Sequence, residues 1–99
     1  KDSLFLDPFN QPVTFLKTSK LRIFSVTLPG HDHLPPTKAF HFWFTEMKNG
    51  KNLIDPFIDE VVHYIQTLYS QNIIHSCAVM GLSRGVFIAA HVAAKLKQI

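Results

Sequence analysis

The chain has 99 residues, of which 46% are hydrophobic, and its mean hydropathy is +0.10. This length suits one small domain and this composition can build a core, so two domains and intrinsic disorder are excluded. The net charge is only +3, without a dense basic stripe, which argues against a nucleic-acid partner and favours a solvated basic face.

The sequence also bears on membrane, compartment and chain ends. Its apolar runs are shorter than the roughly 18 residues that a membrane span needs, and no secretory signal opens it. Cys77 is the single cysteine, so no disulfide forms within the chain, which fits a reducing, cytoplasmic compartment. Its apolar neighbours predict that Cys77 is a small buried side chain. The chain begins with Lys1 and ends at Ile99 inside a predicted helix, so we expect a partial chain of a larger protein.

The first half of the sequence predicts one strand and two less regular segments. Residues 1–20 contain two prolines close together, which predict irregular structure with a short helix at most, over 12–17. Residues 21–28, LRIFSVTL, are rich in β-branched and aromatic residues and predict a strand that Pro29 and Gly30 end. After a loop, residues 37–50 fit either a strand by alternation or a helical apolar stripe, and the helical or irregular interpretation is favoured.

The clearest predicted element is a helix over residues 55–71. Its apolar side chains recur on one face with a period of 3.6 residues: Phe57, Ile58, Val61, Val62, Ile65, Leu68 and Tyr69. Asp55 suits the N-cap, with Pro56 at the first helical position. Asp59 and Glu60 fit stabilisation by the helix dipole better than acid–base chemistry.

The last third of the sequence predicts a strand, a sharp turn and a helix. Residues 73–80, IIHSCAVM, indicate a buried strand, residues 81–85 a tight turn, and the alanine-rich residues 86–97 a helix that is apolar nearly all round. A strand, a crossover helix and a second strand make a right-handed parallel βαβ unit. The predicted class is therefore α/β, in one domain over residues 1–99.

The turn has the form G-x-S-x-G, with Gly81, Ser83 and Gly85 at the fixed positions. Serine is a poor nucleophile by itself and needs a base and an oxyanion hole. A tight strand-to-helix turn exposes the hydroxyl, its glycines allow close approach, and the helix start favours negative charge. We therefore expect Ser83 as nucleophile and the backbone N–H of Arg84 as one oxyanion donor. The alternative is an ordinary glycine turn in which Ser83 is an N-cap.

These residues carry a resemblance to a known family. The segment GLSRGVFIAAHVAA is similar to the nucleophile elbow and following helix of α/β-hydrolases, in the branch of dienelactone hydrolases and prolyl-oligopeptidase-like esterases. VTLPGHDHL and KAFHFWF resemble two other segments of that fold, so the resemblance covers residues 21–96. Val86 stands where members of this branch often have glycine. The resemblance implies part of a three-layer α/β sheet and a serine esterase with a small-molecule acyl substrate and no cofactor or metal.

Several parts of such a site are missing from the sequence. The triad order in this fold is serine, acid, histidine, yet none of the sixteen residues after Ser83 is Asp or Glu. His91 lies eight residues along the helix, about 12 Å away, and is expected to be an ordinary helix histidine. The base and acid are expected beyond Ile99, and no second oxyanion donor is found before Leu21.

The remaining candidate residues are weaker. His31 and His33 lack a third metal ligand, and Asp32 between them is poorly placed to orient a base. Aromatic residues at 40 and 42–44 suit core packing better than an acyl pocket. Two hypotheses stay open: a serine hydrolase of an ester or related acyl bond, and a truncated, non-catalytic module. For the 99 residues alone, the missing base favours the second, and the substrate and oligomeric state stay undetermined.

Overall fold

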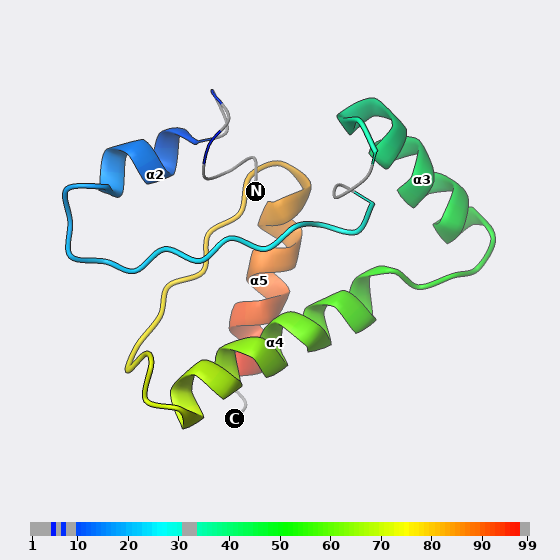
Figure 1. Cartoon of the computed structure of the whole chain (residues 1–99). Helices are drawn as coiled ribbons and strands as arrows, with labels where there is room; N and C mark the ends of the chain where they lie inside the picture. Colours follow the sequence, from blue (N-terminus) through cyan, green and yellow to red (C-terminus); the bar gives the residue numbers. More distant parts are fainter. Residues whose placement is uncertain (1–4, 6, 8–9, 31–33, 98–99) are drawn as a thin grey trace.

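The computed structural model describes residues 5, 7, 10–30 and 34–97, and these contain four helices and no strand. The helices are α2 (Gln11–Leu16), α3 (Pro36–Lys48), α4 (Ile54–Ser70) and α5 (Arg84–Lys97) (Figure 1). The predicted α/β class, with its parallel βαβ unit, is therefore wrong for the described part of the chain. The predicted short helix near residue 12 and the helices after residues 55 and 86 are present.

At the start of helix α4, a side chain binds backbone N–H groups of the first turn. The side-chain oxygen of Asn52 accepts hydrogen bonds from the backbone N–H groups of Ile54 and Asp55, each at 3.1 Å. The predicted N-cap at Asp55 is therefore wrong: Leu53 occupies the N-cap position, the side chain of Asn52 before it binds the free N–H groups, and Asp55 lies in the first turn. Acceptance of two N–H groups by one carboxamide satisfies donors that have no partner within the helix.

The core lies between α4 and α5, which pack against each other. Ile58 and Val92 are each 1% exposed at its centre, and Val61, Val62 and Ile88 are buried around them. Ile58, Val61 and Val62 belong to the apolar face that the period of α4 predicts, and the other two residues lie on α5. At its rim, Lys95 of α5 forms an exposed ion pair with Asp59 of α4.

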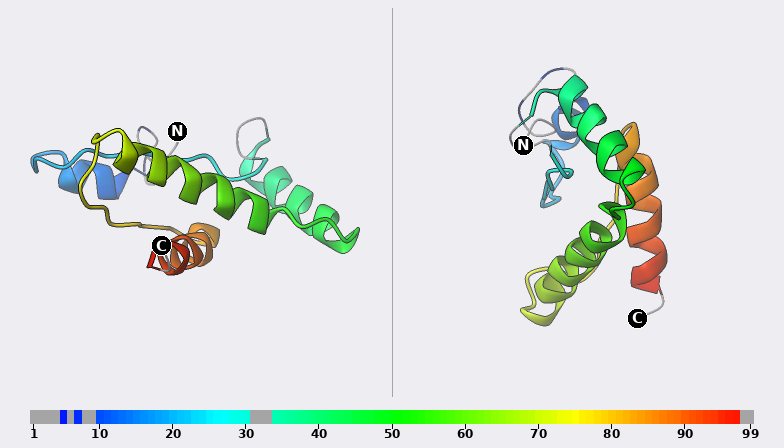
Figure 2. Two further views of the ribbon diagram at one scale, coloured as in Figure 1. Left: turned by 90° about the horizontal axis from the view of Figure 1, so that it is seen from below. Right: turned by 90° about the vertical axis from the view of Figure 1, so that its right-hand side faces the viewer.

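Helix α3 joins this core through Trp43, with Phe42 packed against the same cluster. Trp43 is 7% exposed and belongs to the same apolar cluster as Ile58 and Val92. Its indole N–H donates to the carbonyl oxygen of Pro29, which fixes the end of the preceding segment onto α3. Helices α2 and α3 lie at opposite ends of the molecule, with the α4–α5 pair between them (Figures 1 and 2).

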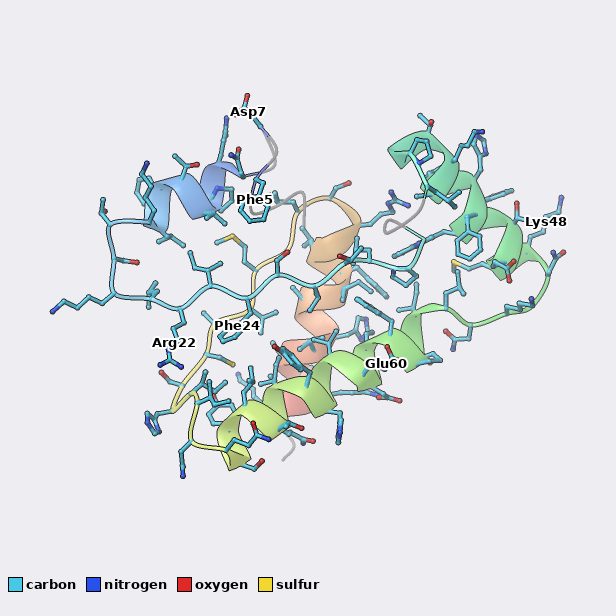
Figure 3. All side chains as sticks on the ribbon, in the orientation of Figure 1. Phe5, Asp7, Arg22, Phe24, Lys48 and Glu60 are labelled. Atoms are coloured by element: carbon cyan, nitrogen blue, oxygen red, sulfur yellow. The ribbon has the colours of Figure 1, made fainter. Side chains whose placement is uncertain are left out.

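Residues 21–28 and 73–80 are extended but do not form the two strands that the sequence predicts. Among the described residues, no backbone hydrogen bond joins one segment to the other. One side-chain contact joins them instead, because the Arg22 guanidinium donates to the carbonyl of Ile73 at 3.2 Å. The Phe24 ring of the first segment meets Tyr64 of α4 edge-on; Figure 3 shows the side chains of Arg22 and Phe24. A β-rich sequence becomes a strand only when a neighbouring backbone pairs with it.

The molecule is open for its size. The radius of gyration is 14.5 Å, whereas a compact chain of this length has about 13 Å. The accessible surface is 7521 Å², against about 5,700 Å² for a folded monomer of 11.3 kDa. The extra surface includes large apolar side chains of the extended segments, such as Leu21 and Met80. Cys77 is exposed as well, so the prediction that it is buried is wrong.

None of the described helices is both long and apolar enough to cross a bilayer.

Candidate functional site at the start of helix α5

Ser83 lies in a sharp turn between the extended segment and α5. Its φ is +53°, in the left-handed region that side-chain-bearing residues rarely occupy, and its side chain is exposed. Two backbone hydrogen bonds close the turn, from Gly85 N–H to the Leu82 carbonyl at 2.8 Å and from Val86 N–H to the Ser83 carbonyl at 3.0 Å. A nucleophile elbow joins a strand to a helix, and residues 73–80 before this turn form no strand, so the elbow prediction is wrong; the structure shows a sharp turn that leads from an extended segment into α5.

The other non-glycine residue with a positive φ in the described part is Asn72, at +57°. Asn72 follows the end of α4, where the N–H groups of Asn72 and Ile73 donate to the carbonyls of Tyr69 and Leu68. This is the Schellman arrangement, in which a left-handed residue satisfies the last carbonyls of a helix and Asn is a common choice. Asn72 therefore has an ordinary structural explanation. Ser83 precedes a helix, where that explanation does not apply.

Side-chain capping does not explain Ser83 either. An N-cap serine has a β-region backbone and accepts a hydrogen bond from an N–H two or three residues later. Within residues 83–87, all of which the structure describes, the Ser83 hydroxyl accepts no such bond. The positive φ costs on the order of 1–2 kcal/mol, and strain of this kind collects at functional sites.

The two glycines of the turn play different parts. A Cβ on Gly81 would lie 1.9 Å from the Gly85 carbonyl oxygen and 2.6 Å from the Val86 nitrogen, so only glycine fits at position 81. A Cβ on Gly85 would meet nothing within 4 Å. The close approach that we expect of both glycines is therefore a requirement at Gly81 alone.

The side chain of Arg84 connects this turn to helix α3. Its guanidinium carbon lies 5.0 Å from the ring centroid of Trp43 and 5.6 Å from that of Phe40. Both distances fall within the range of a cation–π interaction, and Trp43 is itself buried in the core. The first residue of α5 is thus held against α3, next to the exposed hydroxyl of Ser83.

A base or acid that contacts Ser83 is not found in the part of the chain that the structure describes. No histidine or carboxylate among these residues hydrogen-bonds to the Ser83 hydroxyl. His91 lies on the exposed side of α5, where its ring packs against Phe87 with centroids 4.3 Å apart. The candidates His31, Asp32 and His33 lie outside the described residues. The described part of the chain also holds no group of three potential metal ligands.

A hollow borders the helices, and its lining does not include the residues of the Ser83 turn. It has a volume of about 490 Å³ and is open to solvent, between residues 27–30, the Phe42 ring and the start of α4 near Leu53 and Phe57. Gly30, with φ +81°, packs so closely on Phe42 that a Cβ there would lie 2.9 Å from its ring. We place no reaction in this hollow, because its wall holds Glu60 as the one ionisable side chain and no nucleophile other than the Thr27 hydroxyl.

The aromatic residues of α3 divide into two groups. Trp43 packs in the core as the sequence predicts, and Phe42 is partly buried. Phe40 and Phe44 are 55% and 60% exposed, so the prediction of core packing is wrong for these two. The contact of Arg84 with Trp43 and Phe40 is not predicted by the sequence analysis. The sequence pattern that could have indicated this contact is the pair Phe40 and Trp43, three residues apart on a helix, together with Arg84 as the one cation in an otherwise apolar helix start.

The thiol of Cys77 contacts the far end of α4. Its hydrogen bond with Tyr69 raises the pKa of the Tyr69 hydroxyl above the ordinary value. Although Cys77 lies close to Ser83 in the sequence, its contact is with Tyr69 at the end of α4, so it forms no part of the candidate site.

No family model, no curated protein and no solved structure matches the chain significantly. Together with the absence of a sheet from the described residues, this overturns the resemblance to α/β-hydrolases on which the expected fold and family were based. The residues of the turn stay as candidates on their local geometry alone.

Proposed function

We propose that Ser83 is the nucleophile of an enzyme that hydrolyses an ester or related acyl bond of a small molecule. The single observation that supports this is the exposed serine with a φ of +53° at the start of α5, for which neither helix capping nor a glycine preference gives a reason. Unexplained backbone strain at a potential nucleophile is a reason to suspect function. The reaction needs no cofactor.

In the proposed reaction, the Ser83 oxygen attacks the acyl carbon and its proton passes to a base. The leaving alcohol takes up a proton as its bond to the acyl carbon breaks, and water then releases the acid from the acyl-serine. Negative charge that develops on the acyl oxygen lies near the positive end of the α5 dipole, beside the backbone N–H of Arg84. None of the described residues that contact Ser83 can act as the base or its acid partner, so the proposal requires both groups to come from another part of the polypeptide.

A fluorophosphonate probe tests the proposal, since it attaches covalently only to activated serines. We expect mass spectrometry of the labelled wild-type protein to place the adduct on Ser83, and Ser83→Ala to abolish it. Ser76→Ala is the matched control, because Ser76 is an exposed serine of the adjacent extended segment and its loss leaves labelling unchanged. Imidazole added as an external base accelerates labelling of Ser83 in the wild type. Labelling that is absent with and without imidazole contradicts the proposal.

The second candidate is a non-catalytic module that binds another protein. It is favoured by the apolar side chains that the open structure exposes, such as Phe87 and Met80 at more than half of their surface, and by the lack of a base at Ser83 among the described residues. Exposed apolar surface of this kind marks interaction sites. Turnover of an activated ester that is lost in Ser83→Ala rejects this candidate. The exposed free thiol of Cys77 fits a reducing, cytoplasmic location for either function.

A further inference from the structure

We propose that the side chain of Arg84 is a positioning residue that holds the Ser83 turn in its strained conformation by clamping the start of α5 onto α3. The expected effect on the labelling of Ser83 rests on the proposed function, whereas the expected effects on Trp43 fluorescence and on hydrogen exchange do not. The proposal concerns the guanidinium, which is distinct from the backbone N–H that the sequence analysis assigns to the oxyanion.

The contact between the Arg84 side chain and α3 involves two aromatic rings. The Arg84 guanidinium lies over two aromatic rings of one helix, 5.0 Å from Trp43 and 5.6 Å from Phe40. These residues lie three apart on α3, so their rings face the same side and receive one planar cation between them. Arg84 is half-buried and Trp43 is buried, which strengthens the attraction relative to a fully hydrated pair.

The Trp43 ring on which the Arg84 guanidinium stacks is itself held in place. Trp43 packs in the core with Ile58 and Val92, and its indole N–H donates to the Pro29 carbonyl. The ring is therefore held from two directions, by apolar contacts and by a hydrogen bond. A cation that stacks on an immobilised ring is itself immobilised, together with the backbone that carries it.

The contact of Arg84 with α3 opposes relaxation of the strained Ser83 backbone. Ser83 is adjacent to Arg84, and relaxation of its φ to the common region swings the start of α5 relative to the preceding segment. Among the described residues, the turn has two backbone hydrogen bonds of its own, donated by Gly85 and Val86, and the side chains of Leu82 and Val86 are 50% and 57% exposed. The contact of Arg84 with α3 therefore anchors the turn to a distant part of the chain, one residue from the Ser83 hydroxyl.

The test compares two substitutions in the full chain. Arg84→Met keeps the length and apolar stem but removes the cation, whereas Arg84→Lys keeps a cation over the rings. A desolvated cation–π contact corresponds to a factor of about 2 to 30 in an equilibrium. We expect the fluorophosphonate labelling rate of Ser83 to fall by about tenfold in Arg84→Met and to stay within about threefold of wild type in Arg84→Lys.

Two structural readouts accompany the labelling. Trp43 is the single tryptophan, so its fluorescence emission reports the contact directly and shifts in Arg84→Met. Hydrogen exchange at the Gly85 and Val86 amides rises by about tenfold in Arg84→Met, while exchange within α4 is unchanged, which shows that the chain stays folded. If the wild type is not labelled, the proposed function fails, yet the emission and exchange still test the clamp. Unchanged emission and unchanged exchange in Arg84→Met overturn it, as does equal loss of labelling in Arg84→Lys.

Discussion

Helices α4 and α5 bury their apolar side chains against each other, whereas the extended segments 21–28 and 73–80 leave many of theirs in water. Ile58 of α4 is 1% exposed, while Ile23 and Leu21 of the first extended segment are 37% and 64% exposed. A helix satisfies its backbone internally and needs one apolar neighbour to bury its face. An extended segment needs neighbours for its backbone as well as for its side chains, and no backbone ladder pairs either segment among the residues that the structure describes.

The largest expected effect comes from truncating isoleucine in each region. Ile58→Ala removes a fully buried side chain from the centre of the α4–α5 core and is expected to lower the free energy of unfolding by about 2–5 kcal/mol. Ile23→Ala makes the same chemical change on the exposed segment and is expected to cost under about 0.5 kcal/mol. Urea unfolding of both variants measures the difference. Equal losses would show that the extended segment is packed as well as the helices.

The junction between the two regions gives the next largest effect. Gly81→Ala drives a Cβ into the Gly85 carbonyl, so the backbone must shift, at a cost of about 1–3 kcal/mol. Gly85→Ala meets nothing and lies inside α5, where alanine is favoured over glycine by about 0.5–1 kcal/mol. Thermal melts of the two variants should therefore move in opposite directions. Destabilisation by both would mean that the turn is tighter around Gly85 than its geometry indicates.

The helix pair is the part of this molecule that the sequence predicts well. The expected helix over residues 55–71 differs by one residue at each end from α4, because its apolar period is a local signal that one partner helix satisfies. The prediction of a cap at Asp55 fails because the capping oxygen belongs to Asn52, which lies before the predicted helix and whose side chain reaches forward to the N–H groups of Ile54 and Asp55. Trp43 was expected in the core and is found there.

The strands could not be predicted in the same way. LRIFSVTL and IIHSCAVM have strand composition, but whether a strand forms depends on a partner backbone that composition does not reveal. At the candidate site, the G-x-S-x-G spacing located the turn and the exposed hydroxyl of Ser83. It could not reveal that Arg84 reaches α3, because that contact joins residues about 40 positions apart.

The smallest expected effect is a pH dependence within the helix pair. The hydrogen bond to Asp59 raises the pKa of Lys95 above its ordinary value. A raised lysine pKa means that the pair stabilises the fold below the ordinary pKa of about 10.4 and that this contribution disappears as pH rises through the raised value. Lys95→Met should therefore lower Tm slightly near neutral pH, and the difference from wild type should shrink at strongly alkaline pH.

Lys97→Met is the matched control for this change, because Lys97 lies in the same last turn of α5 and has no ion pair among the described residues. Both lysines interact with the helix dipole, so the difference between the two variants isolates the contact with Asp59. A Tm difference that is constant from neutral to strongly alkaline pH would contradict the role of the ion pair.

Residue-resolved hydrogen exchange tests the central contrast between the two regions most directly. The account predicts slow exchange for the amides of Val61, Val62 and Val92 inside α4 and α5, and exchange near that of an unfolded peptide for Ile23, Phe24 and residues 76–80. Protection in every second residue of both extended segments, at the level of the helices, would instead show paired strands and contradict the all-helical structure on which the geometry of the Ser83 turn is based.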